Sequence, residues 1–290
     1  MTGPERPVER ILVVGAGAMG SQISMLCALA GYRTEVFDVS PQQYEAALQA
    51  LRPRLAGMVE KGRLREEDSE AAFARLSFVA DLDDGAQHAD LVIEAATERL
   101  EVKQDIFRRL GMAAPAHTIL TSNSSTLASS HLAAASERPE LLCNMHFFNP
   151  ALHMECVEVV RNPNTSDATV ETVLQLARSL GKKPVLVRRE VPGFIANRLM
   201  GALQKEALGL LAAGVATMED IDTTARTALN HPMGPFELMD FVGLDVVNFI
   251  SEAAYGETGN PDDAPDPQVS ALVQAGKLGR KSGEGWYRYP

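Results

Sequence analysis

The chain has 290 residues, of which 46% are hydrophobic and 22% charged, a balance that is typical of globular proteins and sufficient for two packed domains. The net charge of −11 argues against nucleic acid or an anionic membrane as a partner, because both attract a cationic surface. No apolar run reaches the roughly 18 residues of a membrane span, and the first residues lack the features of a targeting peptide, which predicts a cytoplasmic protein.

Short apolar runs alternate with helical segments over about the first 190 residues. Strands are predicted at residues 11–14, 34–37, 77–79, 91–94, 118–121, 141–147, 157–160 and 185–187. Helices are predicted at residues 18–30, 41–61, 66–76, 100–110 and 166–180. This alternation predicts an α/β fold over residues 1–189: a Rossmann-like, doubly wound and mostly parallel sheet, with residues 41–76 as an inserted helical pair.

The pattern changes near residue 190, just before Pro192 and Gly193. Beyond this point the apolar spacing predicts only helices, at residues 194–213, 217–229, 243–255 and 267–275. The stretch 256–266 is rich in Pro, Asp and Gly and predicts an exposed connection. We therefore predict an all-helical second domain over residues 190–290.

A glycine-rich turn follows the first predicted strand. Residues 15–20 read GAGAMG and fit G-x-G-x-x-G, in which Gly15 permits a tight turn, Gly17 the close approach of a pyrophosphate, and Gly20 the packing of helix on strand. Such a match arises by chance when alone, but here it stands between a strand and a helix. Asp38 ends the second strand, where a carboxylate binds ribose hydroxyls and repels a 2′-phosphate. We predict NAD rather than NADP as the cofactor.

One of the six histidines, His146, lies in the aromatic segment NMHFFNP at residues 144–150, and Glu158 follows in the next predicted strand. Oxidation of an alcohol requires a base for the hydroxyl proton, and imidazole suits this task because its usual pKa lies near working pH. A buried structural histidine is the alternative that these residues leave open.

The cysteines predict no redox or metal chemistry. Cys27, Cys143 and Cys156 have no CxxC spacing and lie in apolar segments. We expect small buried side chains in a reducing compartment, and we predict no metal site.

A series of motifs resembles the 3-hydroxyacyl-CoA dehydrogenase family, in particular the 3-hydroxybutyryl-CoA dehydrogenase type. The motifs are SNSS at 122–125, HFFNP at 146–150, VEVV at 157–160, PGFIANR at 192–198, MGPFEL at 233–238 and GRKSGEGWY at 279–287. They stand in the family's order and at similar spacing. The resemblance implies that NAD oxidises an (S)-3-hydroxyacyl-CoA to a 3-oxoacyl-CoA, with a bias to short chains, as in β-oxidation or butanoate metabolism.

The resemblance also implies the roles of the catalytic residues. His146 would be the general acid/base, with Glu158 hydrogen-bonded to its far ring nitrogen, and Ser125 and Asn197 would hold the reacting oxygen. Without the resemblance, a strand-end hydroxyl bonded to backbone explains Ser125, and a polar helix face explains Asn197.

The same resemblance implies a set of cofactor contacts. They are Gly15, Gly17, Met19, Gly20, Asp38, Gln43, Ala95, Glu98, Lys103, Asn123 and Asn149. Glu98, Lys103 and Asn149 match positions near the nicotinamide half of NAD, and Gln43 matches one near the adenosine.

An acyl-CoA partner carries a 3′-phospho-ADP and requires local positive charge. Arg52, Arg54, Lys61, Arg63 and Arg65 provide it in the predicted helical pair, with Lys61 and Arg63 best placed; a solvated helix face is the alternative.

The chain departs from the family pattern at several positions. Glu155 stands where lysine is usual, His153 replaces an apolar residue, and Pro53, Ala56 and Gly57 replace polar or basic residues. These changes concern the CoA contacts and the acyl pocket more than the chemistry.

The helical domain is expected to close the active-site cleft and to form a homodimer.

Two other functions remain open from the sequence. One alternative is a related dehydrogenase that uses the same pair on a non-CoA hydroxy acid or a carnitine-like alcohol. The other is a catalytically idle NAD-binding protein, against which the presence of Ser125, His146, Glu158 and Asn197 argues.

Overall fold

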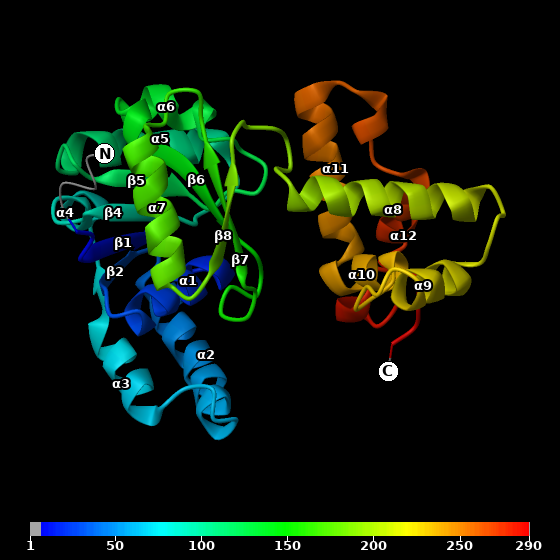
Figure 1. Cartoon of the computed structure of the whole chain (residues 1–290), viewed down its shortest axis with the longest axis horizontal. Coiled ribbons are helices and arrows are strands. Elements are labelled where there is room, and N and C mark those ends of the chain that lie inside the picture. The colour runs from blue at the N-terminus through cyan, green and yellow to red at the C-terminus, as the bar shows by residue number, and fades with distance from the viewer. Residues whose placement is uncertain (1–6, 290) are drawn as a thin grey trace. The chain divides into compact units, whose positions relative to one another are not determined.

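The computed structural model describes residues 7–289. The chain folds into two compact units, Met1–Val191 and Pro192–Pro290. Strands and helices alternate in the first unit, and helices build the described part of the second (Figure 1). None of the helices within residues 7–289 combines the length and the hydropathy that crossing a membrane would require.

The first unit contains one eight-stranded sheet of order β3-β2-β1-β4-β5-β6-β7-β8. Its strands are β1 (Arg10–Val14), β2 (Arg33–Phe37), β3 (Leu76–Val79), β4 (Leu91–Glu94), β5 (Ile119–Ser122), β6 (Leu142–Phe147), β7 (Cys156–Arg161) and β8 (Lys183–Val187). Neighbouring strands are parallel except for β6 and β7, which pair antiparallel. The predicted fold class, a mostly parallel sheet covered by helices, is confirmed.

Helices contribute to two cores on opposite faces of this sheet (Figure 1). One core receives α1 (Ala18–Leu29), α2 (Pro41–Glu60), α3 (Glu66–Arg75) and α7 (Asp167–Ser179); the other receives α4 (Leu82–Ala86), α5 (Leu100–Ala113) and α6 (Ser130–Ser136). In β1, Ile11 and Val13 join the first core, whereas Leu12 and Val14 join the second. Burial on both faces explains why the strands appear in the sequence as continuous apolar runs.

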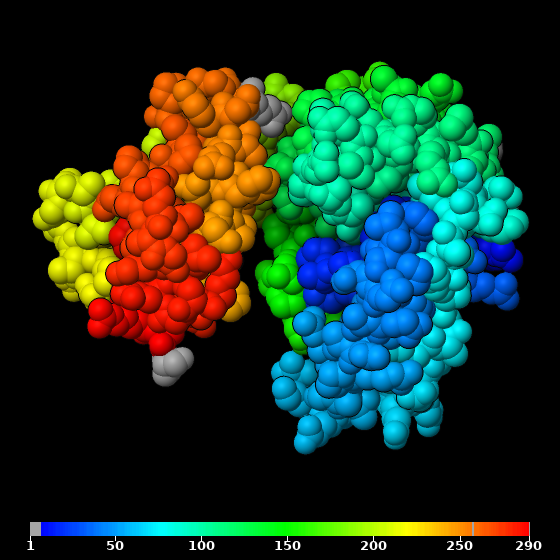
Figure 2. Space-filling model, turned by 180° about the vertical axis from the view of Figure 1, so that it is seen from behind, coloured from blue at the N-terminus to red at the C-terminus, as the bar shows by residue number. Residues whose placement is uncertain are grey.

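The short elements of the first unit were not predicted. Helices α4 and α6 and the 3-10 turn η1 (Pro139–Leu141) are too brief to show a helical period. The long helical pair, in contrast, matches its prediction and projects from the sheet as an arm (Figure 1 and Figure 2). Leu51 and Leu55 anchor α2 in the core, and Pro53 lies within α2 without ending it.

The second unit consists of short helices around its own core. They are α8 (Ala196–Ala212), α9 (Met218–Thr227), α10 (Pro235–Val242), α11 (Leu244–Thr258) and α12 (Pro267–Gln274), with 3-10 turns η2 (Pro261–Asp263) and η3 (Arg280–Ser282). Two details of the prediction are wrong. Helix α10 was not predicted, because it is short and starts at a Gly-Pro pair, and α11 continues to Thr258 through part of the stretch expected to be an exposed connection.

Asp222 joins two of the family-like motifs of the second unit. Its buried carboxylate accepts hydrogen bonds from the N–H groups of Phe236 and Glu237, at 2.9 and 3.0 Å, and from the Tyr287 hydroxyl at 2.9 Å. Burial raises the pKa of Asp222 even though these hydrogen bonds oppose the rise. A Cβ at Gly234 would lie 2.3 Å from the Asp222 side chain. The motif at 233–238 is therefore accounted for by packing.

Asp240 has the same role for the C-terminal motif. It accepts hydrogen bonds from the N–H groups of Trp286 and Tyr287 and from the Tyr289 hydroxyl, each at 2.9 Å. A Cβ at Gly285 would lie 2.0 Å from Oδ1 of Asp240. The segment therefore closes on α10 only because glycine stands at this position.

Candidate active site

The predicted cofactor loop and the predicted base lie at one edge of the sheet. Strands β1, β4, β5 and β6 are mutually parallel neighbours, so their carboxyl ends meet at the same edge. Gly15 follows β1, Ala95 follows β4, Asn123 follows β5, and His146 lies near the end of β6. Ligands of open α/β sheets bind at this edge.

Glycine is favoured at each of the three loop positions for a different structural reason. Gly15 has a φ of +107°, and a Cβ there would lie 2.6 Å from the carbonyl oxygen of Ala95. A Cβ at Gly20 would lie 1.9 Å from the carbonyl oxygen of Gly15, so α1 packs closely on the turn. A Cβ at Gly17 would meet no atom within 4 Å. The space in front of Gly17, at the start of α1, is therefore open to a phosphate group.

Asp38 is held in place beside this loop. Its Oδ2 accepts a hydrogen bond from the N–H of Ala16 at 2.7 Å, and its Oδ1 accepts one from the N–H of Ser40 at 2.9 Å. Each oxygen retains a lone pair for a ribose hydroxyl. A pocket of about 650 Å³ is lined by Gly15, Gly17, Asp38, Gln43 and Ala95, among others. These residues fit the adenosine and pyrophosphate of NAD.

Ser125, His146 and Glu158 form a hydrogen-bonded chain. The Ser125 hydroxyl lies 3.0 Å from Nε2 of His146, and Nδ1 of His146 lies 2.9 Å from Oε2 of Glu158. His146 and Glu158 face each other across the antiparallel pair β6 and β7 and are only 3% and 1% exposed. A carboxylate at Nδ1 favours the ring proton on that nitrogen, so that Nε2, which faces the Ser125 hydroxyl, is the nitrogen suited to exchange a proton with a substrate.

The surroundings of this chain match the aromatic setting expected from the sequence. The Phe148 ring meets the His146 ring edge-on, with 4.6 Å between the ring centroids. The Asn123 side chain accepts a hydrogen bond from the N–H of Phe147 at 2.9 Å, which joins the end of β5 to β6. Asn149 is exposed and precedes the cis peptide bond to Pro150.

Three further residues predicted to contact the cofactor have partners within the protein. Lys103 is 1% exposed, and its ammonium lies 2.7 and 2.8 Å from the two carboxylate oxygens of Glu94. Glu98 accepts hydrogen bonds from the side chain of Ser124 and the N–H of Ser125, at 2.7 and 3.2 Å. Met19 packs against the first core. None of the three lines the described cofactor pocket.

Sequence reasoning did not single out Glu94, and it gave no role to Ser122 within the motif at 122–125. Both end buried apolar strands, β4 and β5, and both are 0% exposed. The available signal was a carboxylate that closes the otherwise apolar run LVIE, since a buried charge requires a partner.

The residues predicted to bind CoA lie at the end of the helical arm. Lys61 caps α2 and Arg63 follows in the turn to α3; both are exposed, and neither forms an ion pair within residues 7–289. Their neighbours are engaged: the Arg52 guanidinium lies 4.5 Å from the centroid of the Phe73 ring, and Arg65 lies 2.7 Å from Asp68. Asn197 lies in the first turn of α8, in the second unit.

The unusual Glu155 has a local explanation. Its carboxylate forms an exposed ion pair with Lys183 at 2.6 Å, and the hydrogen bond from Lys183 holds the pKa of Glu155 below its usual value. Burial raises the pKa of Cys27 and Cys143 to about 12, which makes both thiols unreactive. The described residues contain no cluster of side chains suited to a metal ion.

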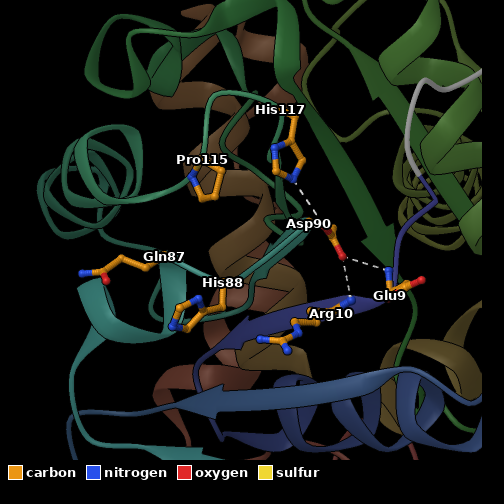
Figure 3. A pocket seen from close by; sticks show the side chains of 7 residues that line it. All are labelled: Glu9, Arg10, Gln87, His88, Asp90, Pro115 and His117. Atoms are coloured by element: carbon orange, nitrogen blue, oxygen red, sulfur yellow. Dashed lines mark hydrogen bonds and ion pairs between the residues drawn. The ribbon is translucent and has the colours of Figure 1, made fainter.

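A smaller pocket of about 270 Å³ lies at the opposite, amino-terminal edge of the sheet (Figure 3). Asp90 there accepts hydrogen bonds from the N–H groups of Glu9 and Arg10, each at 2.9 Å, and lies 3.2 Å from Nε2 of His117. These contacts fix the start of β1.

Comparison with known proteins agrees with this geometry. Residues 10–191 match the family described as 3-hydroxyacyl-CoA dehydrogenase, NAD binding domain, and residues 193–289 match 3-hydroxyacyl-CoA dehydrogenase, C-terminal domain. A probable 3-hydroxybutyryl-CoA dehydrogenase of Bacillus subtilis is 40% identical over 282 residues, 97% of this chain and 98% of that protein.

Two solved structures are also similar over nearly the whole chain. The (S)-3-hydroxybutyryl-CoA dehydrogenase of Ralstonia eutropha has a TM-score of 0.92 and 35% identity, covering 98% of this chain and 99% of its own. A diketoreductase that acts on dicarbonyl compounds has a TM-score of 0.86 and 33% identity, with 100% of both chains covered. The present chain therefore belongs to the 3-hydroxyacyl-CoA dehydrogenase family and is an NAD-dependent oxidoreductase.

Proposed function

We propose that the protein catalyses the reversible reaction of an (S)-3-hydroxyacyl-CoA and NAD to a 3-oxoacyl-CoA, NADH and a proton, with short acyl chains preferred. The observation that carries this proposal is the buried chain of Ser125, His146 and Glu158 at the same sheet edge as the glycine loop. An imidazole held by a carboxylate can act as a base, and the loop would hold the cofactor at the same edge of the sheet.

In the proposed mechanism, Nε2 of His146 takes the proton of the substrate 3-hydroxyl group. Glu158, 2.9 Å from Nδ1, stabilises the imidazolium that forms. The residues of the glycine loop and Asp38 would hold NAD, whose nicotinamide ring would supply the acceptor for the hydride of the substrate C3. In the reverse direction the imidazolium returns its proton to the carbonyl oxygen, and the Ser125 hydroxyl polarises that oxygen. General acid–base catalysis of this kind contributes roughly 10²–10⁴-fold.

The substrate class is supported by the names of relatives and by charge on the helical arm. The similar proteins of Bacillus subtilis and Ralstonia eutropha carry the name 3-hydroxybutyryl-CoA dehydrogenase. The exposed cations Lys61 and Arg63 would bind the 3′-phospho-ADP of CoA. The second unit would supply Asn197 to the reacting oxygen and form a homodimer, for which exposed Leu199 and Phe249 offer apolar surface.

A second candidate function is reduction of a dicarbonyl compound that carries no CoA. The similarity to the diketoreductase favours it. The same acid–base pair would serve both reactions, because each transfers one proton and one hydride.

The test is a substrate panel with NADH and purified protein. We expect NADH oxidation with acetoacetyl-CoA, and kcat/KM lower by at least about 10²-fold with free acetoacetate, because the CoA contacts are lost. Equal kcat/KM for free dicarbonyls would support the second candidate. Absence of turnover with every substrate, despite NADH binding, would support an idle NAD-binding protein.

The CoA contacts are tested by reversing charge on the arm. In the double variant Lys61→Glu/Arg63→Glu we expect the KM for acetoacetyl-CoA to rise about tenfold or more while the Kd of NADH stays unchanged. Arg178→Glu, an exposed arginine on α7, is the matched control and should change neither. An equal rise in KM for both variants would reject the assignment of Lys61 and Arg63.

A further inference from the structure

A closed ring of side chains leads to Ser125, and no step of the proposed reaction uses it. Its members are Glu94, Ser122, Ser124, Glu98 and Lys103, here named the Glu94 ring. The carboxylate of Glu94 accepts from the Lys103 ammonium at 2.7 and 2.8 Å and from the Ser122 hydroxyl at 2.7 Å. Ser122 Oγ accepts from the Ser124 N–H at 3.2 Å, and Ser124 Oγ donates to Glu98 at 2.7 Å. Lys103 closes the ring, 3.6 Å from Glu98.

Four of the five members of the ring are buried. Glu94 and Ser122 are 0% exposed and Lys103 is 1% exposed, whereas the Glu98 side chain is 34% exposed. Taking an ion pair out of water costs about as much as its attraction returns, so apolar residues of equal volume often stabilise a fold equally well. Stability alone therefore does not explain why Glu94 and Lys103 occupy the end of β4 and the start of α5.

The contacts of the ring point to the active site. Oε1 of Glu98 accepts a hydrogen bond from the N–H of Ser125 at 3.2 Å, and the Ser125 hydroxyl lies 3.0 Å from Nε2 of His146. Glu94 also accepts a hydrogen bond at 2.8 Å from the N–H of Ala96, which lines the cofactor pocket. The ring thus fixes the backbone after β4, at Ala96, and the backbone after β5, at Ser125. Both segments lie at the sheet edge where the reaction is proposed to occur.

We propose that Glu94 is a positioning residue, which acts through the Glu94 ring to hold the Ser125 hydroxyl at hydrogen-bonding distance from His146. Lys103 serves within the protein as the counter-charge of Glu94 and Glu98. The benefit to catalysis rests on the proposed function, whereas the geometry is a property of the protein without ligands.

Three variants separate positioning from charge balance. Glu94→Gln leaves the buried Lys103 ammonium with the more distant Glu98 carboxylate, at 3.6 Å, as its counter-charge, and Lys103→Met leaves the buried Glu94 carboxylate without a cationic partner. The double variant Glu94→Gln/Lys103→Met removes both charges and keeps an acceptor for the N–H of Ala96. We expect each single change to lower Tm and the double variant to return close to the wild-type Tm.

The decisive measurement is the NMR signal of the His146 ring Nε2 in protein labelled with 15N-histidine, without ligands. The signal is identified by its loss in His146→Gln, and Ser125→Ala gives its position when the Ser125 hydrogen bond is absent. We expect the signal of the double variant to move toward that of Ser125→Ala. With acetoacetyl-CoA and NADH, we expect kcat to fall on the order of tenfold, because a displaced catalytic group reacts more slowly.

The control is Asp90→Asn, at the other end of β4. Asp90 is likewise a buried carboxylate that accepts backbone N–H groups, and it lies near His117 (Figure 3). It precedes β4, at the amino-terminal edge of the sheet, whereas Ser125 follows β5 at the carboxyl edge. We expect this variant to lower Tm while the His146 signal and kcat stay at wild-type values.

Two results would overturn the proposal. One is a double variant whose His146 signal stays at the wild-type position, since the pair of Glu94 and Lys103 would then be structural only. The other is an Asp90→Asn variant that moves the His146 signal equally, since the signal would then report general loosening. Absence of wild-type turnover with acetoacetyl-CoA would reject the proposed function, and the NMR comparison would still decide the role of Glu94.

Discussion

Two buried carboxylates of the first unit contact basic side chains, whereas two buried carboxylates of the second unit contact neutral hydrogen-bond donors. In the first unit, Glu94 meets the ammonium of Lys103 and Glu158 meets the imidazole of His146. In the second unit, Asp222 and Asp240 meet backbone N–H groups and tyrosine hydroxyls. Imidazole changes charge near neutral pH and backbone amides do not. The motifs that resemble the family therefore differ in their contacts: the motif around His146 holds the groups of the proposed chemistry, and the motifs that contact Asp222 and Asp240 close the fold of the second unit.

One glycine of each unit shows the same contrast. A Cβ at Gly17, in the first unit, would enter open space, whereas one at Gly285, in the second, would lie 2.0 Å from Asp240. The first glycine leaves room for a ligand and the second leaves room for the protein itself. These two positions are therefore expected to respond differently to substitution.

The largest expected effect is on turnover in the first unit. In His146→Gln we expect kcat to fall roughly 10²–10⁴-fold, because the base is lost, while the Kd of NADH and the free energy of unfolding stay near wild type. Steady-state kinetics and NADH fluorescence titration measure this. Near-normal turnover would remove His146 as the base.

The second unit should respond in stability instead. Asp222→Ala leaves the N–H groups of Phe236 and Glu237 without their acceptor, so we expect about 1–3 kcal/mol less free energy of unfolding. Urea denaturation measures the loss, and the Kd of NADH should not change in the folded variant. A weakened NADH affinity at full stability would contradict the division between the units.

The loop glycine should respond in ligand affinity. In Gly17→Ala the new methyl group occupies the space left for a phosphate, so we expect the Kd of NADH to rise about tenfold, or ~1.4 kcal/mol. Gly57→Ala, a helical position that is also open, is the control and should leave the Kd unchanged. Unchanged Kd in both variants would mean that Gly17 does not face the cofactor.

The smallest effect concerns pH. Burial, and then the hydrogen bond to Asp240, raise the pKa of Tyr289 to about 12. An unfolded tyrosine releases its proton near pH ~10, so between pH ~10 and 12 the folded state binds the extra proton and stability falls as pH rises. Tyr289→Phe should start about 1 kcal/mol less stable at pH 8 and decline less steeply, as urea midpoints would measure. Parallel pH curves would refute this account.

The sequence was sufficient for the strands and the long helices. Apolar runs such as residues 91–94 are buried on both sheet faces and match their predictions, because burial dictates composition directly. Helices α4, α6 and α10 escaped prediction, since brief elements are fixed by the contacts of their ends rather than by a period of their own.

For the candidate site, the sequence by itself determined the residue types, the glycine loop between strand and helix, and the presence of His146 and Glu158 with the family's motifs. Only the tertiary structure decided which groups meet. Strands β6 and β7 pair antiparallel, and this pairing places His146 directly opposite Glu158, although the two residues are separated along the chain. The closing of the Glu94 ring across β4, α5 and β5 likewise depends on strand order. Hydrogen bonds and ion pairs act over a few ångströms, and local sequence patterns do not specify distances between residues far apart in the chain.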